Sequence, residues 1–277
     1  MLEAVINISE GRDLDTVRGI GAAAGDHLLD VHSDADHHRS VLTIAGPDIE
    51  ARALAVVSRA IAGIDLRTHL GVHPRVGAVD VVPIVPIGEA TMTDALAVRN
   101  NLARAIADFG VPVFLYGPER SLPNIRRTAF TDLAPDYGPA QPHVTAGAAC
   151  VGARPLLVAY NVWLEPAATV AQAQAIARSL RSDAVRALGL EVGGRAQVSC
   201  NLIAPSRVGP DAVVDSVALQ AAVAGTELVG LIPAAVLESI DPARWASLDL
   251  HPSKTIEARL RETGLDGGRF QVRPEPQ

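Results

Sequence analysis

Aromatic residues are scarce in this sequence, since tryptophan, tyrosine and phenylalanine together make up 3% of its 277 residues. A chain with so few aromatic rings offers no platform on which nucleic-acid bases stack. Basic residues are also outnumbered, with 24 against 31 acidic residues and a net charge of −7. Because a nucleic-acid binder needs a basic face, we do not expect nucleic acid among the partners of this protein.

Cysteine and long apolar runs are scarce as well. The two cysteines, Cys150 and Cys200, cannot form a disulfide framework in a chain of this length, so we expect two free thiols. No apolar run approaches the roughly 18–20 residues that cross a bilayer, and the first residues lack the basic and apolar regions of a secretory signal. We therefore expect a cytoplasmic protein without a membrane partner.

The short motifs of several large enzyme classes are absent too. The sequence contains neither of the glycine-rich loops, G-x-x-x-x-G-K-[ST] and G-x-G-x-x-G, that bind nucleotide phosphates. It also lacks the G-x-S-x-G turn of serine hydrolases and the H-E-x-x-H helix of zinc hydrolases. Hydrophobic residues nevertheless make up 48% of the chain, which is ample for a folded core.

The alternation of apolar and amphipathic segments predicts an α/β (α+β) fold in two similar halves. In the first half we expect strands at 3–8, 27–32, 40–45, 78–85 and 112–116 and helices at 12–24, 48–64 and 92–109. In the second half we expect strands at 155–164, 196–203 and 227–232, with a hairpin around Gly193 and Gly194 leading into the strand at 196–203, and helices at 166–181 and 210–224. Each half approximates βαββαβ, with helices on the outer face of a mixed sheet. We predict two subdomains, 1–152 and 153–277, with a ligand cleft or tunnel between them.

Helix ends and helix faces add local predictions. Asp48 is expected to cap the helix at 48–64 with its side chain. Pro166 is expected near the first turn of the helix at 166–181. Leu14 is expected on the buried face of the helix at 12–24. The buried stripe expected for the helix at 48–64 consists of Leu54, Val57, Ile61 and Ile64.

One histidine lies on a turn that leads into a predicted strand. His73 stands between Gly71 and Pro74, and Gly77 precedes the strand at 78–85. Proline restricts the residue before it to an extended conformation, and glycine permits tight turns. An imidazole transfers protons in both directions near neutral pH. His73 is therefore a candidate general acid/base, although a turn histidine that only caps the strand fits this pattern equally well.

Other polar clusters have more than one interpretation. The loop at 32–39 contains three histidines and two aspartates, which fits a metal site, a solvated loop or polar groups of a substrate site. Asn7 ends the first strand, and Ser9 beside it either caps the next helix or contacts a ligand. The loop at 136–148 is either a plain connection or a shaped loop whose backbone groups bind a heterocycle. A basic patch suited to carboxylates, or a solvated surface, is formed by Arg120, Arg126 and Arg127.

Together these segments resemble the formiminotransferase domain of the formiminotransferase-cyclodeaminase family, without the cyclodeaminase part. The resemblance is carried by N-I-S-E-G at 7–11, L-L-D-V at 28–31, H-R-S-V at 38–41 and G-V-H-P-R-V-G-A-V-D at 71–80. It continues through P-V-F-L-Y-G at 112–117, D-Y-G-P at 136–139, V-G-A-R at 151–154, Q-V-S at 197–199 and E-L-V-G-L-I-P at 227–233. The matches run in order from residue 3 to about residue 240.

The resemblance implies a folate-dependent transferase that moves a formimino group from N-formimino-L-glutamate to N5 of tetrahydrofolate, in histidine catabolism and one-carbon metabolism. It implies His73 as the general acid/base, tetrahydrofolate as the co-substrate, a homodimer and no metal. Asn7 belongs to a matching motif, and Arg39 and Arg154 are hypothesised to hold glutamate carboxylates. The folate-contacting loop of the family corresponds to Gly138, Pro139, Ala140, Gln141, Pro142, His143, Val144, Thr145, Ala146 and Gly147.

The chain departs from the family pattern at four positions. His32 stands where the family usually has an aspartate that assists the catalytic histidine, and we hypothesise that its imidazole replaces that acid. The other departures are Leu70, Val72 and Trp163. They leave two alternatives to the transferase, which are a diverged folate-binding homologue without transferase activity and a related formyl-group reaction.

Overall fold

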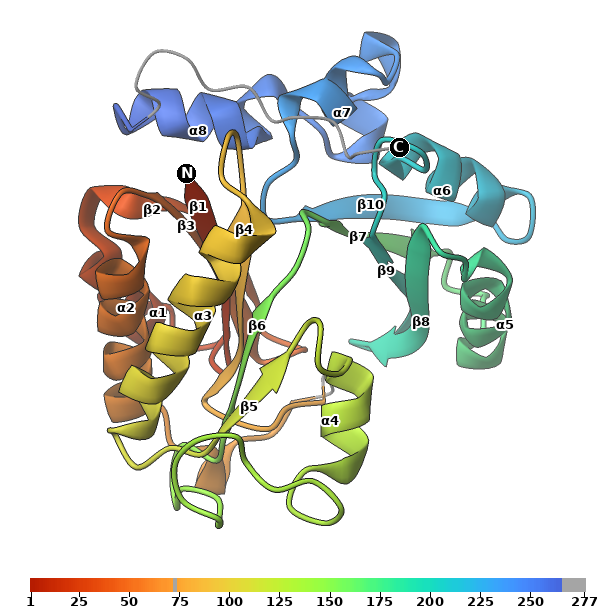
Figure 1. Ribbon diagram of the computed structural model, residues 1–277. Coiled ribbons are helices and arrows are strands. Elements are labelled where there is room, and N and C mark those ends of the chain that lie inside the picture. Colours follow the sequence, from red (N-terminus) through yellow and green to blue (C-terminus); the bar gives the residue numbers. More distant parts are fainter. Residues whose placement is uncertain (72–73, 266–277) are drawn as a thin grey trace. The chain divides into compact units, whose positions relative to one another are not determined.

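The structure is a computed structural model that describes residues 1–71 and 74–265 (Figure 1). The chain divides into two compact units, Met1–Pro155 and Leu156–Gln277. His73 and Val72, singled out in the sequence, lie outside the described residues. In the part of the chain that is described, no helix combines the length and the apolar character needed to cross a bilayer.

The first unit is built on a six-stranded sheet with the strand order β2-β3-β1-β4-β6-β5. The strands are β1 (Leu2–Ile8), β2 (Leu28–Asp34), β3 (Arg39–Gly46), β4 (Val79–Pro86), β5 (Val113–Tyr116) and β6 (Ala149–Ala153). The first four strands pair antiparallel, and β6 pairs parallel with both β4 and β5. The mixed sheet predicted for this half is therefore confirmed, with β6 as a strand that the sequence pattern did not indicate.

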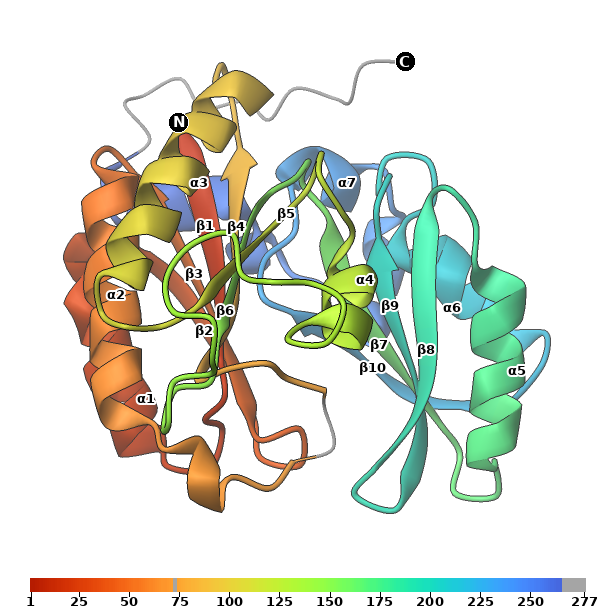
Figure 2. The ribbon, with the colours of Figure 1, turned by 60° about the horizontal axis from the view of Figure 1, so that its bottom comes forward.

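Helices cover both faces of this sheet unequally. The longer ones are α1 (Leu14–Gly21), α2 (Ile49–Gly63) and α3 (Met92–Ala107), and they lie on one face (Figures 1 and 2). The short helix α4 (Leu122–Thr128) lies against the other face, where its Ile125 packs with Phe114 and Cys150. Two 3-10 segments complete the unit, η1 (Ala22–His27) and η2 (Leu66–Thr68).

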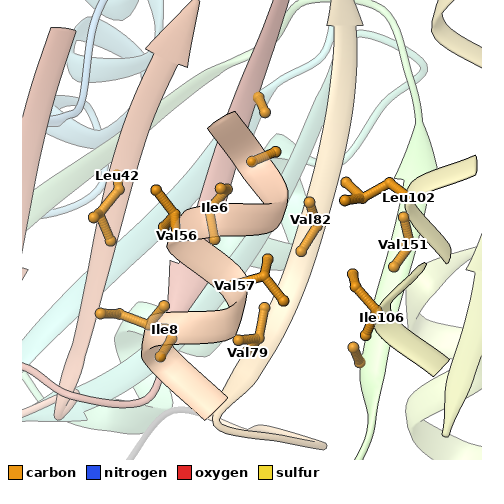
Figure 3. Close-up of a cluster of buried hydrophobic side chains, with 14 of the residues drawn as sticks. Ile6, Ile8, Leu42, Val56, Val57, Val79, Val82, Leu102, Ile106 and Val151 are labelled. Atoms are coloured by element: carbon orange, nitrogen blue, oxygen red, sulfur yellow. The ribbon is translucent and has the colours of Figure 1, made fainter. Parts of the chain in front are cut away.

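The core of the first unit forms between the sheet and these three helices (Figure 3). Ile6 and Ile8 point from β1 towards Val56 and Val57 of α2, since alternate residues of a strand share one face. Each of these fully buried aliphatic side chains stabilises the fold by about 1.5–3 kcal/mol. The same alternation leaves Asn7, between the two isoleucines, on the opposite face of the sheet.

A bulge in β4 disturbs this alternation. Ile8 lies opposite Val79, but its neighbour Asn7 lies opposite Val81, so Asp80 is an extra residue in β4. Such a bulge bends a strand locally and redirects a side chain. Val79 and Val82 both reach the helix-covered core although they are three residues apart. Asp80 is thereby placed on the face that also carries Asn7.

The second unit contains a four-stranded sheet with the order β10-β7-β9-β8. Its strands are β7 (Val158–Leu164), β8 (Val185–Val192), β9 (Arg195–Leu202) and β10 (Val223–Val229), with α5 (Val170–Leu180) and α6 (Pro210–Ala218) on one face. The short elements α7 (Ala234–Glu238), η3 (Pro242–Arg244), η4 (Ala246–Leu248), η5 (Pro252–Lys254) and α8 (Ile256–Glu262) follow. The strand order repeats that of β2-β3-β1-β4, so two similar βαββαβ arrangements are confirmed. The mixed sheet predicted for this half is wrong, because its described strand pairs are antiparallel.

Several predicted boundaries are also wrong. Helix α5 begins only at Val170, because the Thr169 side chain accepts the N–H of Gln172 and caps the helix there, whereas Pro166 lies in the preceding turn. Helix α6 ends at Ala218, and the β-branched Val223 already begins strand β10. The helix expected at 12–24 is divided between α1 and η1, and Leu14 at its start is half exposed.

The predictions for α2 are corrected in two respects. Asp48 precedes the helix with a positive φ of 54°, and its side chain makes no capping hydrogen bond. Leu54 and Ile61 are only partly buried, whereas the smaller Ala53 and Ala60 are fully buried. Small side chains let the helix approach the sheet closely, so its buried face is shifted from the stripe of large residues. That buried face consists of Ile49, Ala53, Val56, Val57 and Ala60.

Candidate active site

A fully buried carboxylate, Asp80, organises the sheet face opposite α1–α3. Its Oδ2 lies 2.5 Å from Nη1 of Arg39 on β3 and 2.6 Å from Nη2 of Arg126 on α4. Its Oδ1 accepts the backbone N–H of Val76 at 2.8 Å. Burial by itself would raise the pKa of Asp80, but the charges of the two arginines and these hydrogen bonds hold it below its ordinary value. The group is therefore an ionised carboxylate between two guanidinium groups.

Arg39 joins this carboxylate to Asn7, a predicted site residue. Its Nε and Nη2 donate to Oδ1 of Asn7 at 3.2 and 2.8 Å, and Nδ2 of Asn7 donates to the backbone carbonyl of Val5 at 2.8 Å. The structure thus brings Asn7 and Arg39 together and gives Arg39 an internal partner, Asp80. Sequence reasoning missed this role of Asp80, although a charged residue within the apolar run V-D-V-V-P was a usable signal.

The prediction of a basic patch from Arg120, Arg126 and Arg127 is corrected, because two of the three arginines pair with different carboxylates within the protein. Arg126 pairs with the buried Asp80, whereas Arg120 donates to both carboxylate oxygens of Asp136 at 2.5 and 3.1 Å. Arg127 is exposed. Only Arg126 belongs to the buried cluster around Asp80.

Arg154 lies against the same face at the end of the first unit. It interacts with the hydroxyl of Tyr116, whose pKa is raised because the ring is buried. Its Nη1 also donates to the backbone carbonyl of Pro155 at 3.0 Å. Arg154 and Arg39 both act electrostatically on Tyr116, so they belong to one region.

His32 shares a cross-strand row with Asn7. It lies opposite Val41, and Val41 lies opposite Asn7, so the three residues occupy the same face of neighbouring strands. Two strand spacings separate His32 from Asn7 by about 10 Å. The other two loop histidines have different surroundings, and Nδ1 of His37 lies 2.8 Å from Asp34. Within residues 1–71 and 74–265, no three His, Cys, Asp or Glu side chains are grouped to hold a metal.

The third histidine of this loop, His38, belongs to a separate cluster. Its ring stacks on His69 with centroids 3.9 Å apart and planes inclined by 12°. Its Nε2 lies 3.0 Å from Oε1 of Glu10, and its Nδ1 lies 2.9 Å from the carbonyl oxygen of Leu70. Nε2 of His69 lies 3.1 Å from the carbonyl oxygen of His38. These contacts connect the loop at 33–39 to the segment that leads to His73.

The segment after His73 is fixed to the predicted folate loop. Gly77 and Gly147 form an antiparallel bridge, and Ala78 donates its N–H to the carbonyl of Ala146 at 2.9 Å. A Cβ at Gly77 would lie 1.7 Å from the carbonyl oxygen of Ala148, so no side chain fits there. Glycine at 77 thus permits the close backbone contact that joins the two segments.

Ser9 holds the same segment from the other side. Its hydroxyl donates to the carbonyl of Gly77 at 2.8 Å, and its N–H donates to the carbonyl of Ala78 at 2.8 Å. The interpretation of Ser9 as a helix cap is therefore wrong, since the cap of α1 is Asp13. Gly77 is held by residues from both ends of the first unit's sequence.

The predicted folate loop itself has an anchored end and an open end. Nδ1 of His143 accepts the N–H groups of Thr145 and Ala146 at 3.3 and 3.1 Å, and His143 and Gly147 exchange two backbone hydrogen bonds. Ala146 is buried, whereas Val144 is 76% exposed. The remaining exposed positions of the loop are Gly138, Pro139, Ala140, Gln141 and Pro142.

The second unit carries its own polar groups on the sheet face opposite α5 and α6. Nδ2 of Asn161 on β7 donates to Glu227 on β10 at 3.0 Å. Gln197 on β9 is buried, and its amide atoms have no hydrogen-bond partner among the described residues. Trp163, one of the four departures, lies under the guanidinium of Arg195 at 5.0 Å.

Comparisons with known proteins cover nearly the whole chain. Residues 1–154 match the family described as formiminotransferase domain, N-terminal subdomain. The chain is 36% identical to the glutamate formimidoyltransferase of Streptococcus pyogenes serotype M1, over 88% of this chain and 92% of that protein. It is 33% identical to the glutamate formimidoyltransferase of Thermoplasma acidophilum, over 88% and 91% of the two chains. It is also 33% identical to the formimidoyltransferase-cyclodeaminase of Sus scrofa, over 84% of this chain and 50% of that protein.

These matches confirm the resemblance that the motifs indicated. The matched family region contains the first unit's sheet, including Asn7, Arg39 and Asp80. The similarity to two glutamate formimidoyltransferases extends over most of both units. The chain therefore belongs to the formiminotransferase family, a family of transferases.

Proposed function

We propose that this protein transfers the formimino group of N-formimino-L-glutamate to N5 of tetrahydrofolate. The observation that carries the proposal is the 36% identity to a glutamate formimidoyltransferase over 92% of that protein's length. The bridge between Gly77 and Gly147 supports it as well, because it joins the sequence neighbourhood of His73 to the loop proposed for folate. Tetrahydrofolate is a co-substrate in this reaction, and the chemistry uses no redox step.

The reaction needs one nucleophilic attack and two proton movements. N5 attacks the amidine carbon and forms a C–N bond, which gives a tetrahedral adduct. His73, as general base, takes the proton from N5 and, as general acid, delivers a proton to the glutamate nitrogen as its C–N bond breaks. A well-placed acid/base of this kind contributes about 10²–10⁴-fold to the rate. His32, on the same sheet face as Asn7, is proposed to assist His73.

The charges of the buried cluster suit substrates that carry carboxylates. Two arginines share the single carboxylate of Asp80, so the cluster of Arg39, Arg126 and Asp80 keeps a net positive charge. Arg154 adds a further cation near Tyr116. Guanidinium groups bind carboxylates through charge-assisted hydrogen bonds. We assign Arg39 and Arg154 to the glutamate carboxylates of the substrates and Asn7 to the orientation of Arg39.

The proposed folate site is the loop from Gly138 to Gly147. Its exposed residues leave backbone N–H and C=O groups available to a heterocycle, while its anchored end keeps the loop in place. The proposal includes a ligand cleft or tunnel between the two units, a homodimer and a cytoplasmic location.

The test is glutamate release from N-formimino-L-glutamate by purified protein, with and without tetrahydrofolate. We expect release that depends on tetrahydrofolate, and a loss of about 10²–10⁴-fold in kcat for His73→Ala. Circular dichroism and thermal unfolding of the variant serve as the folding control. Folded wild-type protein that binds tetrahydrofolate without releasing glutamate would instead indicate a folate-binding homologue. Turnover of the N-formyl donor alone would indicate the formyl-group reaction.

A further inference from the structure

The cluster of Glu10, His38 and His69, which we term the histidine brace, is not used by the proposed chemistry. Hydrogen-bond geometry determines the protonation of its central ring. Both ring nitrogens of His38 face acceptors, the carboxylate of Glu10 at 3.0 Å and the carbonyl of Leu70 at 2.9 Å. A carbonyl and an ionised carboxylate have no hydrogen to donate, so both nitrogens of His38 must carry protons to form both bonds. His38 in this arrangement is an imidazolium.

The surroundings of the Glu10 carboxylate favour its ionised form. Its Oε1 accepts the backbone N–H groups of Gly11, Arg12 and Asp13 at 2.9, 2.8 and 3.0 Å. Burial acts to raise the pKa of Glu10, but the hydrogen bonds from Asp13 and Arg12 and the charge of His38 lower it below its ordinary value. Glu10 is therefore a fixed negative charge opposite Nε2 of His38.

His69 is the neutral member of the brace. Its Nε2 faces the carbonyl of His38 at 3.1 Å and so carries the proton, whereas its Nδ1 is buried and has no partner among the described residues. Burial, followed by the charges of Arg75 and His38, lowers its pKa. The stack thus consists of a neutral imidazole on an imidazolium. Two hydrogen bonds from side chain to backbone hold it, one from the His38 ring to the carbonyl of Leu70 and one from the His69 ring to the carbonyl of His38.

The brace fixes the chain immediately before His73. Leu70 lies three residues before His73 in the sequence, and its carbonyl is held by His38. Gly71 follows with no room for a side chain, since a Cβ there would lie 2.6 Å from the carbonyl oxygen of His37. The carbonyl of Gly71 accepts from Nη2 of Arg75 at 2.6 Å. His38 therefore acts on the flank of His73 without belonging to the groups assigned to the substrates.

We infer that His38, as an imidazolium paired with Glu10, is a positioning residue for the segment that carries His73. The inference rests on the proposed function, because it takes His73 as the general acid/base. Loss of one proton from His38 would remove the donor of either its bond to Leu70 or its bond to Glu10, so both bonds exist together only while the ring is an imidazolium. Glu10 and His69 contact the ring of His38, Arg75 acts electrostatically on His69, and the neighbouring His37 is engaged with Asp34.

The pH profile of kcat/KM for folate-dependent glutamate release tests this inference. Removing the carboxylate in Glu10→Gln leaves an acceptor of the same size but no charge to favour the imidazolium. We expect the alkaline limb of the profile to move to lower pH by about one unit, with the acidic limb unchanged.

His38→Asn keeps a residue type that tolerates the positive φ of 49° found there but removes the imidazole ring. We expect kcat to fall by about 10–100-fold with KM within about twofold, and the alkaline limb due to His38 to disappear.

The control is His251→Asn, an exposed histidine of the second unit whose ring bonds only to Ser253 among its described contacts. It should keep the wild-type profile. If Glu10→Gln and His38→Asn fold normally and keep both limbs within about 0.2 pH units of the wild-type profile, the expected shift of about one unit is absent and the inference is overturned.

A second measurement separates this inference from the proposed function. Nuclear magnetic resonance of protein with ¹⁵N-labelled histidine and carbonyl-¹³C-labelled leucine follows the His38 ring and the Leu70 carbonyl without any substrate. We expect the two signals to titrate together in the wild type, at lower pH in Glu10→Gln, and the Leu70 titration to be lost in His38→Asn. A Leu70 signal that does not change as the His38 ring titrates would overturn the inference even if the enzyme is active. If the His38 and Leu70 signals titrate together in a protein that releases no glutamate, the inference on the histidine brace holds and the proposed transferase function is rejected.

Discussion

Asp80 on β4 and Arg126 on α4 are separated by 46 residues in the sequence, yet their Oδ2 and Nη2 atoms lie 2.6 Å apart on one face of the sheet. Arg39 reaches the same oxygen atom from β3. One carboxylate thus holds three elements together, and it does so where water does not reach it. The two guanidinium groups depend on that carboxylate, which makes its removal costly.

Substitution of this carboxylate gives the first prediction. Asp80→Asn leaves two arginines facing a neutral amide inside the protein. Removing one partner of a buried ion pair costs about 3–5 kcal/mol, so we expect a loss of this size in the free energy of unfolding, measured with urea. The exposed pair of Arg244 and Asp215 provides the control, and Asp215→Asn should cost less than about 1 kcal/mol. Equal losses in the two variants would contradict the role of Asp80.

The pH dependence of the same group gives a second prediction. The pKa of Asp80 is lower in the folded protein than its ordinary value, so its contribution is fully present above the unfolded-state pKa of about 3.9. It is lost as the pH falls through the folded-state pKa, because the unfolded chain then binds the proton first. The difference in unfolding free energy between wild type and Asp80→Asn should therefore be constant from pH 7 to pH 5 and shrink below pH 4. Urea titrations at these pH values measure it, and a difference that grows on acidification would refute the assignment.

Glu257 in α8 gives a prediction of opposite sign. It is buried, and burial raises its pKa although its carboxylate accepts the N–H of Ala234 at 2.8 Å. An acid whose folded-state pKa is raised destabilises the protein at pH values above that pKa. Glu257→Gln keeps an acceptor for Ala234 and should raise Tm at pH 7 by about 1–3 °C. Glu262→Gln, at an exposed position of the same helix, should leave Tm unchanged. A lower Tm for Glu257→Gln would show that the charge is needed.

The contact between Gly77 and the folate loop gives the last prediction. Gly77→Ala would place a Cβ 1.7 Å from the carbonyl of Ala148, so the two segments must separate. We expect a lower Tm and tetrahydrofolate binding weakened by about tenfold or more, measured by calorimetry. In Gly19→Ala the added Cβ meets no atom within 4 Å, and replacing a helical glycine should stabilise the fold by about 0.5–1 kcal/mol. A Gly77→Ala variant that binds like the wild type would contradict the proposed site.

Local patterns in the sequence predicted the repeated element order well, because strand alternation and helix periodicity are local. They failed where a distant partner decides the outcome. The bulge at Asp80 depends on the pairing of β4 with β1, and its arginines come from residues 39 and 126. Asp48 resembled a helix cap because its residue type is favoured there, but its backbone is left-handed and its side chain makes no cap.

The motifs predicted a family more readily than they predicted contacts. Asn7 and Arg39 were singled out separately, and only the structure joins them through hydrogen bonds. Glu10 lay within a quoted motif without a role, since its partner His38 is 28 residues away. Side-chain partners of this kind follow from the register of β1 and β3, which no single segment encodes.

The repeated strand order has a consequence for how the two sheets avoid aggregation. The fourth strand of the repeat is an interior strand in the first unit, because β4 pairs with β6 on its outer side. Its counterpart in the second unit, β10, lies at the edge of its sheet among the described residues, and the N–H of Leu228 on this strand donates to the Asp249 carboxylate at 2.9 Å. Edge strands in general risk association with another chain. Strand β10 shifts register between Val223 and Gly225, and an irregular edge is a poor template for a foreign strand. At the fourth strand of the repeat, the first unit therefore avoids an edge by pairing further strands with β4. The second unit keeps an edge strand there, but the register of that strand is irregular.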